Sequence, residues 1–342
     1  MTSPDSPVDR APGSRLGYLA RAALTLIILV GLISVLGDDR LPEIILQVSL
    51  AAFLVSMALN IVASIVLPAV VSFVSAKQTS VSMSLVMFIV INFTIRFYTL
   101  ILPRASATAV RWFKYRAAGT GASAATLVVL EKVVQVFSYG AIAALFMVVE
   151  RQALGRAAPV VLTIAAGLVL ISGIGLIALF TDRIDFALAR LGFVTRIPWI
   201  GTTIHRLIDA VVSQRGRPPW QVVSLIFWNA LGYAFFVASA WVIAHEFGIA
   251  VSVSALAWIR GLVFLGTLIP ITIAGAGIRE AGFVGFLSIY GVDESTALAF
   301  ALALLGVQMA IGAIGGLLEL ASSISKKPDL QLQPGQAPHG KQ

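Results

Sequence analysis

Residues Thr267 to Phe283, TLIPITIAGAGIREAGF, place two adjacent charges beside a proline and several glycines in an otherwise apolar region. A guanidinium group offers a planar fork of N–H donors that fits a phosphate or carboxylate. A helix beginning near Gly277 would add the partial positive charge of its N-terminus. Glu280 could balance Arg279 when no ligand is bound. The stretch therefore predicts a site for an anionic group, and the residues expected to form it are Pro270, Gly275, Gly277, Arg279 and Glu280.

The same charges also have plainer interpretations. Arg279 and Glu280 could simply form an ion pair, or Arg279 could extend along its helix until the charge reaches the membrane interface. Charged side chains within a membrane are rare and by default indicate a functional site. We keep both interpretations open.

A second stretch, LPRASATAVR from Leu102 to Arg111, follows the same order of apolar helix, proline, small residues and arginine. Corresponding broken segments in the two halves of a transporter indicate its binding site. The two stretches thus favour an inverted repeat, with chance similarity as the alternative. The repeat adds Arg111 to the candidate headgroup-binding residues, although for Arg111, nearer an interface, pairing or an interfacial position is the favoured interpretation. Asn92 and Arg96 are added because they interrupt the apolar segment 81–102.

The elements that must position these residues are membrane helices. Hydrophobic residues make up 58% of the 342 residues and charged residues only 12%, and the mean hydropathy is +0.95. An all-α, polytopic integral membrane protein is expected. Apolar blocks of roughly 20 residues, long enough to cross a bilayer, are Leu16–Leu36, Ile44–Val66, Ala124–Val149, Pro159–Phe180, Val222–Ala244 and Thr296–Leu320.

Two further apolar segments, 81–102 and 254–290, fit no simple crossing. Basic residues concentrate in cytoplasmic loops, and the basic stretch 104–116 lies on the inside only if segment 81–102 dips into the membrane and returns. Segment 254–290 must likewise begin and end outside. We therefore expect about six full spans and two broken, re-entrant Pro-Gly segments, about eight membrane helices in all.

These spans predict one transmembrane domain, residues 16–322, with cytoplasmic termini. Its first half covers about 16–180 and its second half about 220–322, joined by a basic cytoplasmic loop, 181–219. Residues 1–15 and 323–342 are expected to be disordered and cytoplasmic.

Composition also excludes several classes of function. The chain has no cysteine and three histidines, so neither a thiolate metal site nor any other metal or cofactor is expected. The net charge of +8 comes from basic residues scattered through short loops, which report membrane orientation. Nucleic-acid binding is not supported.

The motif of proline followed by Gly-x-Gly-x-Arg-Glu, together with LPRASATAVRWFKYRAAG and LVVLEKVVQ, resembles the flippase-like membrane region of lysylphosphatidylglycerol synthetases and their stand-alone relatives. The resemblance covers roughly Leu16 to Leu320. It implies a flippase of the bacterial inner membrane that moves an anionic or polyprenyl-type lipid between leaflets. The synthetase activity belongs to a separate soluble domain, for which no room follows Leu320, so no catalytic residue is expected. The first motif departs from the family, since Ala107 and Thr108 stand where a glycine is usual.

Two other classes of function remain open. Membrane glycosyltransferases that use lipid-phosphate donors place acidic residues in the first outward loop, where Asp38 and Asp39 lie here. A non-transporting partner of lipid- or polysaccharide-biosynthesis enzymes is the other alternative. Phospholipids, aminoacyl lipids, polyprenyl-phosphate sugars and hopanoid lipids all fit the transport prediction, and any oligomeric state is compatible with it.

Overall fold

A computed structural model describes residue 30 and residues 41–77, 83–102, 104–120, 123–155, 158–177, 219–268 and 275–325. Every regular element within these ranges is helical, as expected. The first predicted span, both predicted disordered termini and nearly all of the loop 181–219 lie outside the described residues.

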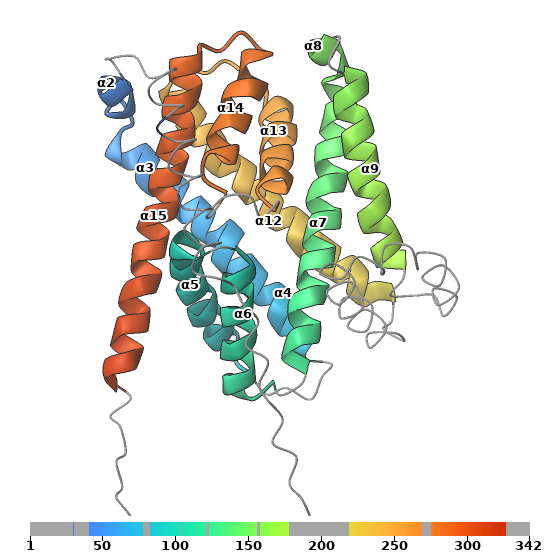
Figure 1. Cartoon of the computed structure of the whole chain (residues 1–342), viewed down its shortest axis with the longest axis vertical. Coiled ribbons are helices and arrows are strands. Elements are labelled where there is room, and N and C mark those ends of the chain that lie inside the picture. Colours follow the sequence, from blue (N-terminus) through green and yellow to red (C-terminus); the bar gives the residue numbers. More distant parts are fainter. Residues whose placement is uncertain are drawn as a thin grey trace, which may run out of the picture.

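Four stretches of helix among the described residues are long and apolar enough to cross a membrane. They are Leu50–Ala76, which comprises α3 (Leu50–Ile61), η1 (Val62–Val66) and α4 (Leu67–Ala76), and parts of α7 (Ser123–Val149), α12 (Pro219–Glu246) and α15 (Glu294–Ser325). A fifth helix, α9 (Ala158–Ile177), packs along α7 at the position of the predicted span 159–180. The short helices α2 (Leu41–Ile45) and α8 (Arg151–Leu154) lie near the upper end of the view in Figure 1.

The predicted span Ile44–Val66 was placed too early in the chain. The helix begins at Leu50, where the Ser49 side chain accepts a hydrogen bond from a backbone N–H of the first turn, and it continues to Ala76. Pro68 does not end it, because a π-helical turn, η1, precedes the proline. Proline lacks a backbone N–H and its ring crowds the preceding turn, and the wider π-turn accommodates both effects.

Two pairs of shorter helices occupy opposite halves of the molecule. Figure 1 shows α5 (Leu85–Ile101) and α6 (Arg104–Tyr115) in the lower half, and α13 (Val253–Gly266) and α14 (Ile278–Ser288) in the upper half. The longest of the four has 17 residues and spans about 26 Å at about 1.5 Å per residue, less than the roughly 30 Å of a hydrocarbon core. The expected return within segment 81–102 is not seen, because α5 is one continuous helix over Leu85–Ile101 and α6 follows it. Re-entry of the two pairs into the membrane stays a prediction.

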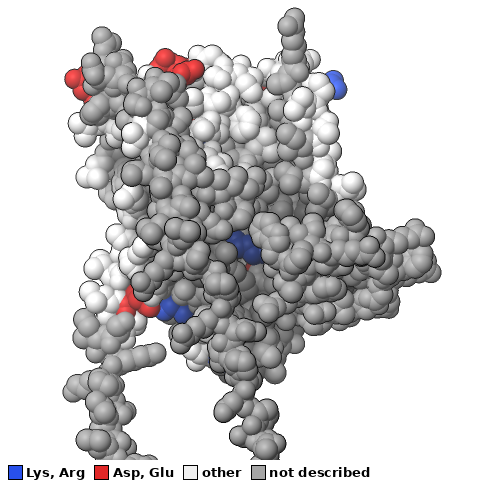
Figure 2. Space-filling model, in the orientation of Figure 1, with Lys and Arg blue, Asp and Glu red and all other residues white. Residues whose placement is uncertain are grey.

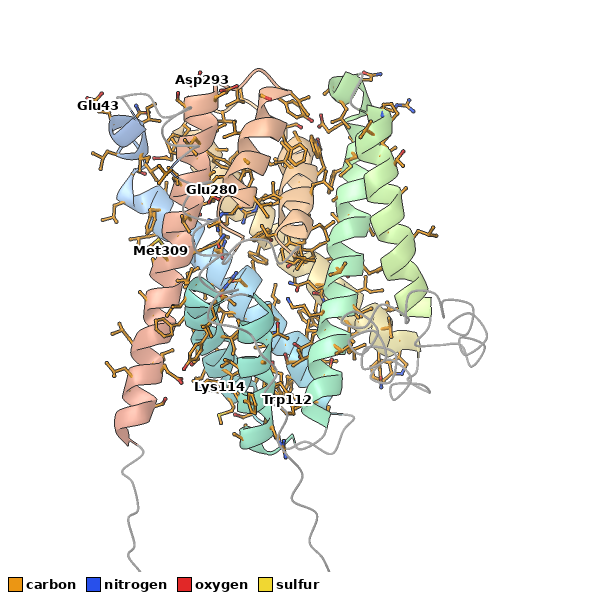
Figure 3. The ribbon with its side chains drawn as sticks, in the orientation of Figure 1. Glu43, Trp112, Lys114, Glu280, Asp293 and Met309 are labelled. Atoms are coloured by element: carbon orange, nitrogen blue, oxygen red, sulfur yellow. The ribbon has the colours of Figure 1, made fainter. Side chains whose placement is uncertain are left out.

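Charged side chains differ between the two ends. Figure 3 shows Glu43 and Asp293 at the upper end and Lys114 in the lower half, and Figure 2 shows acidic atoms on the upper rim. The predicted outward loops around residues 37–43 and 246–253 adjoin elements at the upper end, whereas η2 (Arg116–Thr120) lies at the lower end. The relative sidedness of the described loops agrees with the predicted topology.

Small residues bring helices α5 and α15 into close contact. A Cβ atom added to Gly315 would lie 2.0 Å from the carbonyl oxygen of Phe93, and one added to Gly312 would lie 2.1 Å from a methyl group of Leu100. Glycine at these positions lets the two backbones approach, which is the usual basis of helix packing in membranes. This contact fixes the lower helix pair against the long helix α15.

Candidate functional site

The predicted pair Arg279 and Glu280 lies in the first turn of α14. The Glu280 side chain is fully buried, and its Oε2 accepts a hydrogen bond of 2.6 Å from the backbone N–H of Gly277. Its Oε1 accepts hydrogen bonds from Nε of Arg279 at 2.9 Å and from Nη2 at 2.5 Å. A glutamate three residues after the N-cap commonly binds the N-cap N–H in this way. The protein's own carboxylate thus occupies the helix N-terminus where an external anion was predicted.

A third contact completes the coordination of Arg279. Its Nη1 donates to the side-chain carbonyl of Gln308 on α15 at 3.0 Å. All three nitrogen atoms of the guanidinium group therefore donate hydrogen bonds within the protein. Arg279 is also buried, with 7% of its surface exposed. The structure has the ion pair of the plainer interpretation, and the phosphate-binding role of Arg279 stays a prediction.

The two predicted glycines have conformations that explain their presence. Gly275 has φ = 74° and Gly277 has φ = 85°, in the region that L-residues with a Cβ rarely adopt. A Cβ atom at Gly275 would also lie 2.6 Å from the Cβ of Thr267. These glycines shape the turn that presents Arg279 and Glu280. Pro270 lies outside the described residues.

The corresponding arginine of the lower pair, Arg111 on α6, has a different partner. Its Nη1 forms an ion pair of 3.1 Å with Glu131 on α7. The side chains of Arg111 and Glu131 are 15% and 7% exposed, so the pair is mostly buried. Arg111 thus pairs, in agreement with the interpretation favoured for it, but through a carboxylate on another helix.

Asn92 serves helix packing in this structure. Its side-chain amide donates to the backbone carbonyl of Ile65 at 3.2 Å, within the π-helical turn. Asn92 is 2% exposed. The contact holds α5 against η1 and does not involve Arg279 of α14.

Arg260, near the middle of α13, is a charged residue that was not predicted. It is 2% exposed, and no described residue offers a hydrogen-bond partner to its Nε or Nη2 atom. Its guanidinium carbon lies 3.5 Å from the centroid of the Phe236 ring, a cation–π contact. The signal was present in the sequence, since Arg260 is the one charge in the apolar run LAWIRGLVFLG.

Three arginines from both helix pairs form a group that we call the arginine centre: Arg96 on α5, Arg260 on α13 and Arg279 on α14. The charge of Arg279 acts on both Arg96 and Arg260, and the charge of Arg96 acts on Arg260. Among the described residues, Glu280 neutralises Arg279, and neither Arg96 nor Arg260 has an ion-pair partner. Guanidinium groups stay protonated in proteins, so the centre carries excess positive charge.

The family model of the lysylphosphatidylglycerol synthase TM region matches residues 18–316 of the chain. The chain belongs to this family. No curated protein and no solved structure matched the sequence. The resemblance noted from the motifs is thereby confirmed, and with the long apolar helices it identifies a multi-pass membrane protein concerned with lipid.

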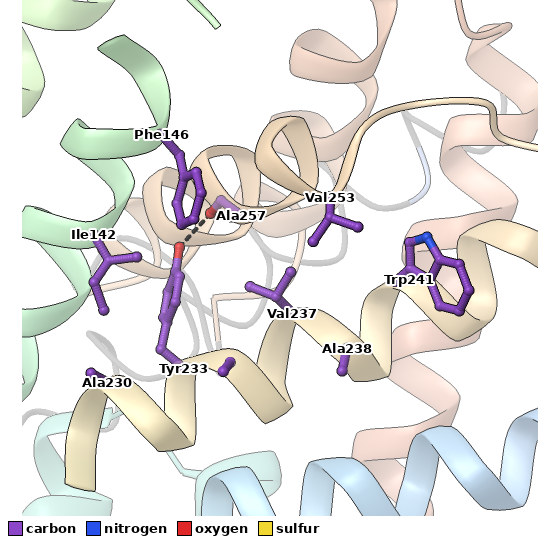
Figure 4. Close-up of a pocket in the computed structure, with 10 residues that line it drawn as sticks. Ile142, Phe146, Ala230, Tyr233, Val237, Ala238, Trp241, Val253 and Ala257 are labelled. Atoms are coloured by element: carbon purple, nitrogen blue, oxygen red, sulfur yellow. Dashed lines mark hydrogen bonds between the residues drawn. The ribbon is translucent and has the colours of Figure 1, made fainter. Parts of the chain in front are cut away.

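The lysylphosphatidylglycerol synthase TM region of this chain also contains an apolar cavity between α7, α12 and α13, with a volume of about 530 Å³. Figure 4 shows Ile142, Phe146, Val237 and Trp241 around it. The hydroxyl of Tyr233 donates to the carbonyl of Ala257 and so leaves the cavity without a free polar group from this side chain. Ala257 precedes Arg260 by one helical turn, so the cavity and the arginine centre share α13.

The acidic residues of this TM region offer no metal site within the described parts of the chain, where no three of His, Cys, Asp and Glu come together. Asp38 and Asp39, on which the glycosyltransferase alternative depends, lie outside the described residues.

Proposed function

We propose that the protein is a flippase that moves a lipid with an anionic headgroup between the two leaflets of a bacterial inner membrane. The observation that supports it most is the excess positive charge of the arginine centre. Removing a charge from water is costly, and an unpaired intramembrane charge is by default a functional hypothesis. The anion at hand in a bilayer is a lipid phosphate, which a guanidinium group binds through two donors.

The arrangement of the helix pairs supports transport over one-sided binding. The arginine centre combines residues of the pair α5–α6 and the pair α13–α14, which enter from opposite ends of the molecule. Broken helices that meet at mid-membrane are the usual binding region of inverted-repeat transporters. We place the lower end, with Lys77, Lys114 and Arg116, in the cytoplasm, because basic residues concentrate there.

Transport is tested with proteoliposomes that contain a fluorescent phosphatidylglycerol and, in parallel, a fluorescent phosphatidylcholine. Addition of a membrane-impermeant quencher reports how fast lipid exchanges between leaflets. We expect the protein to accelerate exchange of the anionic lipid. We expect Arg279→Lys to lose at least about tenfold in rate, because lysine keeps the charge but lacks the planar fork that binds Glu280 and Gln308 together. Arg151→Lys, at an exposed position, is the matched control.

Two outcomes would contradict the proposal. Equal rates for liposomes with and without protein would remove transport from consideration. Equal acceleration of phosphatidylglycerol and phosphatidylcholine would show that transport does not select a headgroup of net negative charge.

A further inference from the structure

We propose that Arg260 is the residue that binds the phosphate oxyanion of the substrate. Arg279, whose donors are bound by Glu280 and Gln308, lies in the same site without binding the oxyanion through its fork. This inference rests on the proposed function in one respect, namely that the bound phosphate belongs to a lipid headgroup. The chemistry itself, a phosphate bound by an unpaired guanidinium group, is shared by a lipid headgroup and a free phosphate.

The first argument is the inventory of hydrogen bonds. In Arg279, the Nε, Nη1 and Nη2 atoms all donate to Glu280 or Gln308. In Arg260, Nε and Nη2 are buried and have no partner among the described residues. These two atoms form one edge of the guanidinium plane, the edge that binds two oxygens of a phosphate at once. The free fork in the arginine centre is therefore that of Arg260.

The second argument is the direction of the existing contact. The guanidinium carbon of Arg260 lies 3.5 Å from the centroid of the Phe236 ring. An edge-on approach at this distance would push a nitrogen atom into the ring, so the ring must meet the face of the guanidinium group. N–H donors lie in the guanidinium plane, so a contact to the face leaves them available. Phe236 thus holds the charge within the apolar interior without using the donors that an oxyanion needs.

The third argument is repulsion. Arg96 and Arg279 both act on Arg260 as like charges. An anion beside Arg260 would relieve this repulsion and satisfy the buried donors, two effects that a lipid without a phosphate cannot provide. The apolar cavity begins one helical turn away at Ala257, where it would receive hydrocarbon of the same ligand. A lipid phosphate should therefore bind more tightly than inorganic phosphate.

The proposal is tested by thermal unfolding of the purified full chain in detergent, with phosphatidylglycerol, diacylglycerol or inorganic phosphate added. A ligand that binds only the folded state raises the melting temperature according to its concentration and affinity. We expect a clear rise with phosphatidylglycerol, a smaller rise with inorganic phosphate and little change with diacylglycerol, which has the hydrocarbon but no phosphate.

The decisive variant is Arg260→Met, which keeps a long side chain that can contact Phe236 through its sulfur. A residue that serves ligand binding leaves unsatisfied donors in the empty protein, so its removal should keep or raise the melting temperature without lipid. The affinity for phosphatidylglycerol should fall about tenfold to a hundredfold. Arg151→Met makes the same change of charge at an exposed position and should leave both readouts unaltered.

Two results would overturn the assignment. One is a lower melting temperature of Arg260→Met without lipid, which would make the guanidinium group structural. The other is an unchanged response of this variant to phosphatidylglycerol, checked on Arg260→Gln by native mass spectrometry of the bound lipid.

Failure of the proposed function would look different from failure of this inference. A wild-type protein that binds phosphatidylglycerol through Arg260 but does not exchange it between leaflets keeps the inference and removes the flippase. An equal response to inorganic phosphate and phosphatidylglycerol keeps Arg260 as the oxyanion ligand and identifies a soluble anion. A wild-type protein with no response to any of these anions overturns the inference.

Discussion

Arg279 and Glu280 are adjacent in sequence and bound to each other in space, with 2.5 Å between Nη2 and Oε1. Loss of one partner leaves the other charge buried, which typically costs about 3 to 5 kcal/mol of folding stability. We therefore expect Arg279→Ala and Glu280→Ala each to unfold at clearly lower temperature. The double variant should recover much of that loss, as measured by thermal unfolding of the three purified proteins.

The same double variant separates a paired role from a transport role. If Arg279 only neutralises Glu280, the double variant should move lipid as fast as the wild type. If Arg279 belongs to the transport site, the double variant should be folded and inactive. A well-folded double variant with full activity would refute the assignment of Arg279 to the site.

Gly315 should tolerate no larger residue. An added methyl group would lie 2.0 Å from the backbone oxygen of Phe93, and relieving this overlap requires α5 and α15 to move apart. We expect Gly315→Ala to lose about 1 to 3 kcal/mol, or more, of unfolding free energy. Gly285, in α14, is the matched control because nothing lies within 4 Å of its added Cβ. Gly285→Ala should gain about 0.4 to 1 kcal/mol by restricting the unfolded chain.

The ionisation of Glu150 should make the folding stability of the protein decrease as the pH falls into the acid range. Burial alone would raise the pKa of Glu150, but hydroxyl groups of Ser252, Ser254 and Tyr290 donate hydrogen bonds to its carboxylate and together hold the pKa below its usual 4.5. A lowered pKa in the folded state stabilises the protein above the pKa of the unfolded chain. This contribution is lost as the pH falls through the folded pKa.

The measurement is the melting temperature of wild type and Glu150→Gln from pH 7 down to pH 3. We expect Glu150→Gln to melt lower at pH 7, with a difference that narrows below about pH 4.5. Glu43→Gln, an exposed carboxylate at the same end of the molecule, provides the control. A difference that is the same at every pH would show that the contacts of Glu150 do not depend on its ionisation.

The orientation can be read from single cysteines in this cysteine-free chain. We expect Arg116→Cys to be protected from an impermeant thiol reagent in intact cells and Ala250→Cys to react, because the two positions lie at opposite ends and the basic end should face the cytoplasm. Both residues are exposed. Labelling of both from outside would contradict the arrangement of helices, and the reverse pattern would invert the orientation.

The glycosyltransferase alternative is tested by Asp38→Asn combined with Asp39→Asn. We expect little loss of function, because two aspartates in a short loop are usually solvated and catalysis of this kind requires placed acid and base groups. Complete loss of function at normal expression would move the enzyme to first place.

Much of the fold could be predicted because the membrane imposes a simple length rule. The spans at α7, α12 and α15 follow directly from apolar runs of the required length. The count of basic residues marked 81–102 and 254–290 as irregular, but it did not predict that 85–101 is one continuous helix followed by α6. The span before Pro68 was the exception, since a proline usually marks a helix end and nothing in the local sequence indicates a π-helical turn.

The site was predictable in part. Arg279 and Glu280 stood out because both charges lie together beside glycines, whereas Arg260 is a single charge in a helix that reads as apolar. Arg260 matters because no described residue accepts a hydrogen bond from its Nε or Nη2 atom. Whether a side chain has a partner is decided by tertiary packing, which the local sequence does not show. For the same reason the partner of Arg111 was out of reach, since Glu131 lies 20 residues further along the chain.

The π-helical turn at Val62–Val66 amounts to one surplus residue in an otherwise continuous helix. Each α-helical residue turns the chain by about 100°, so the surplus sets how the faces of α3 and α4 are offset. With that offset, Ser56 on α3 contacts Ser239 of α12 while Ser72 on α4 contacts Tyr115 of α6. Deletion of a single residue from the turn would rotate one set of contacts away while the other stayed in place. The rotation between α3 and α4 therefore has to suit two sets of contacts at once, those with α6 of the lower helix pair and those with α12 in the second half of the chain.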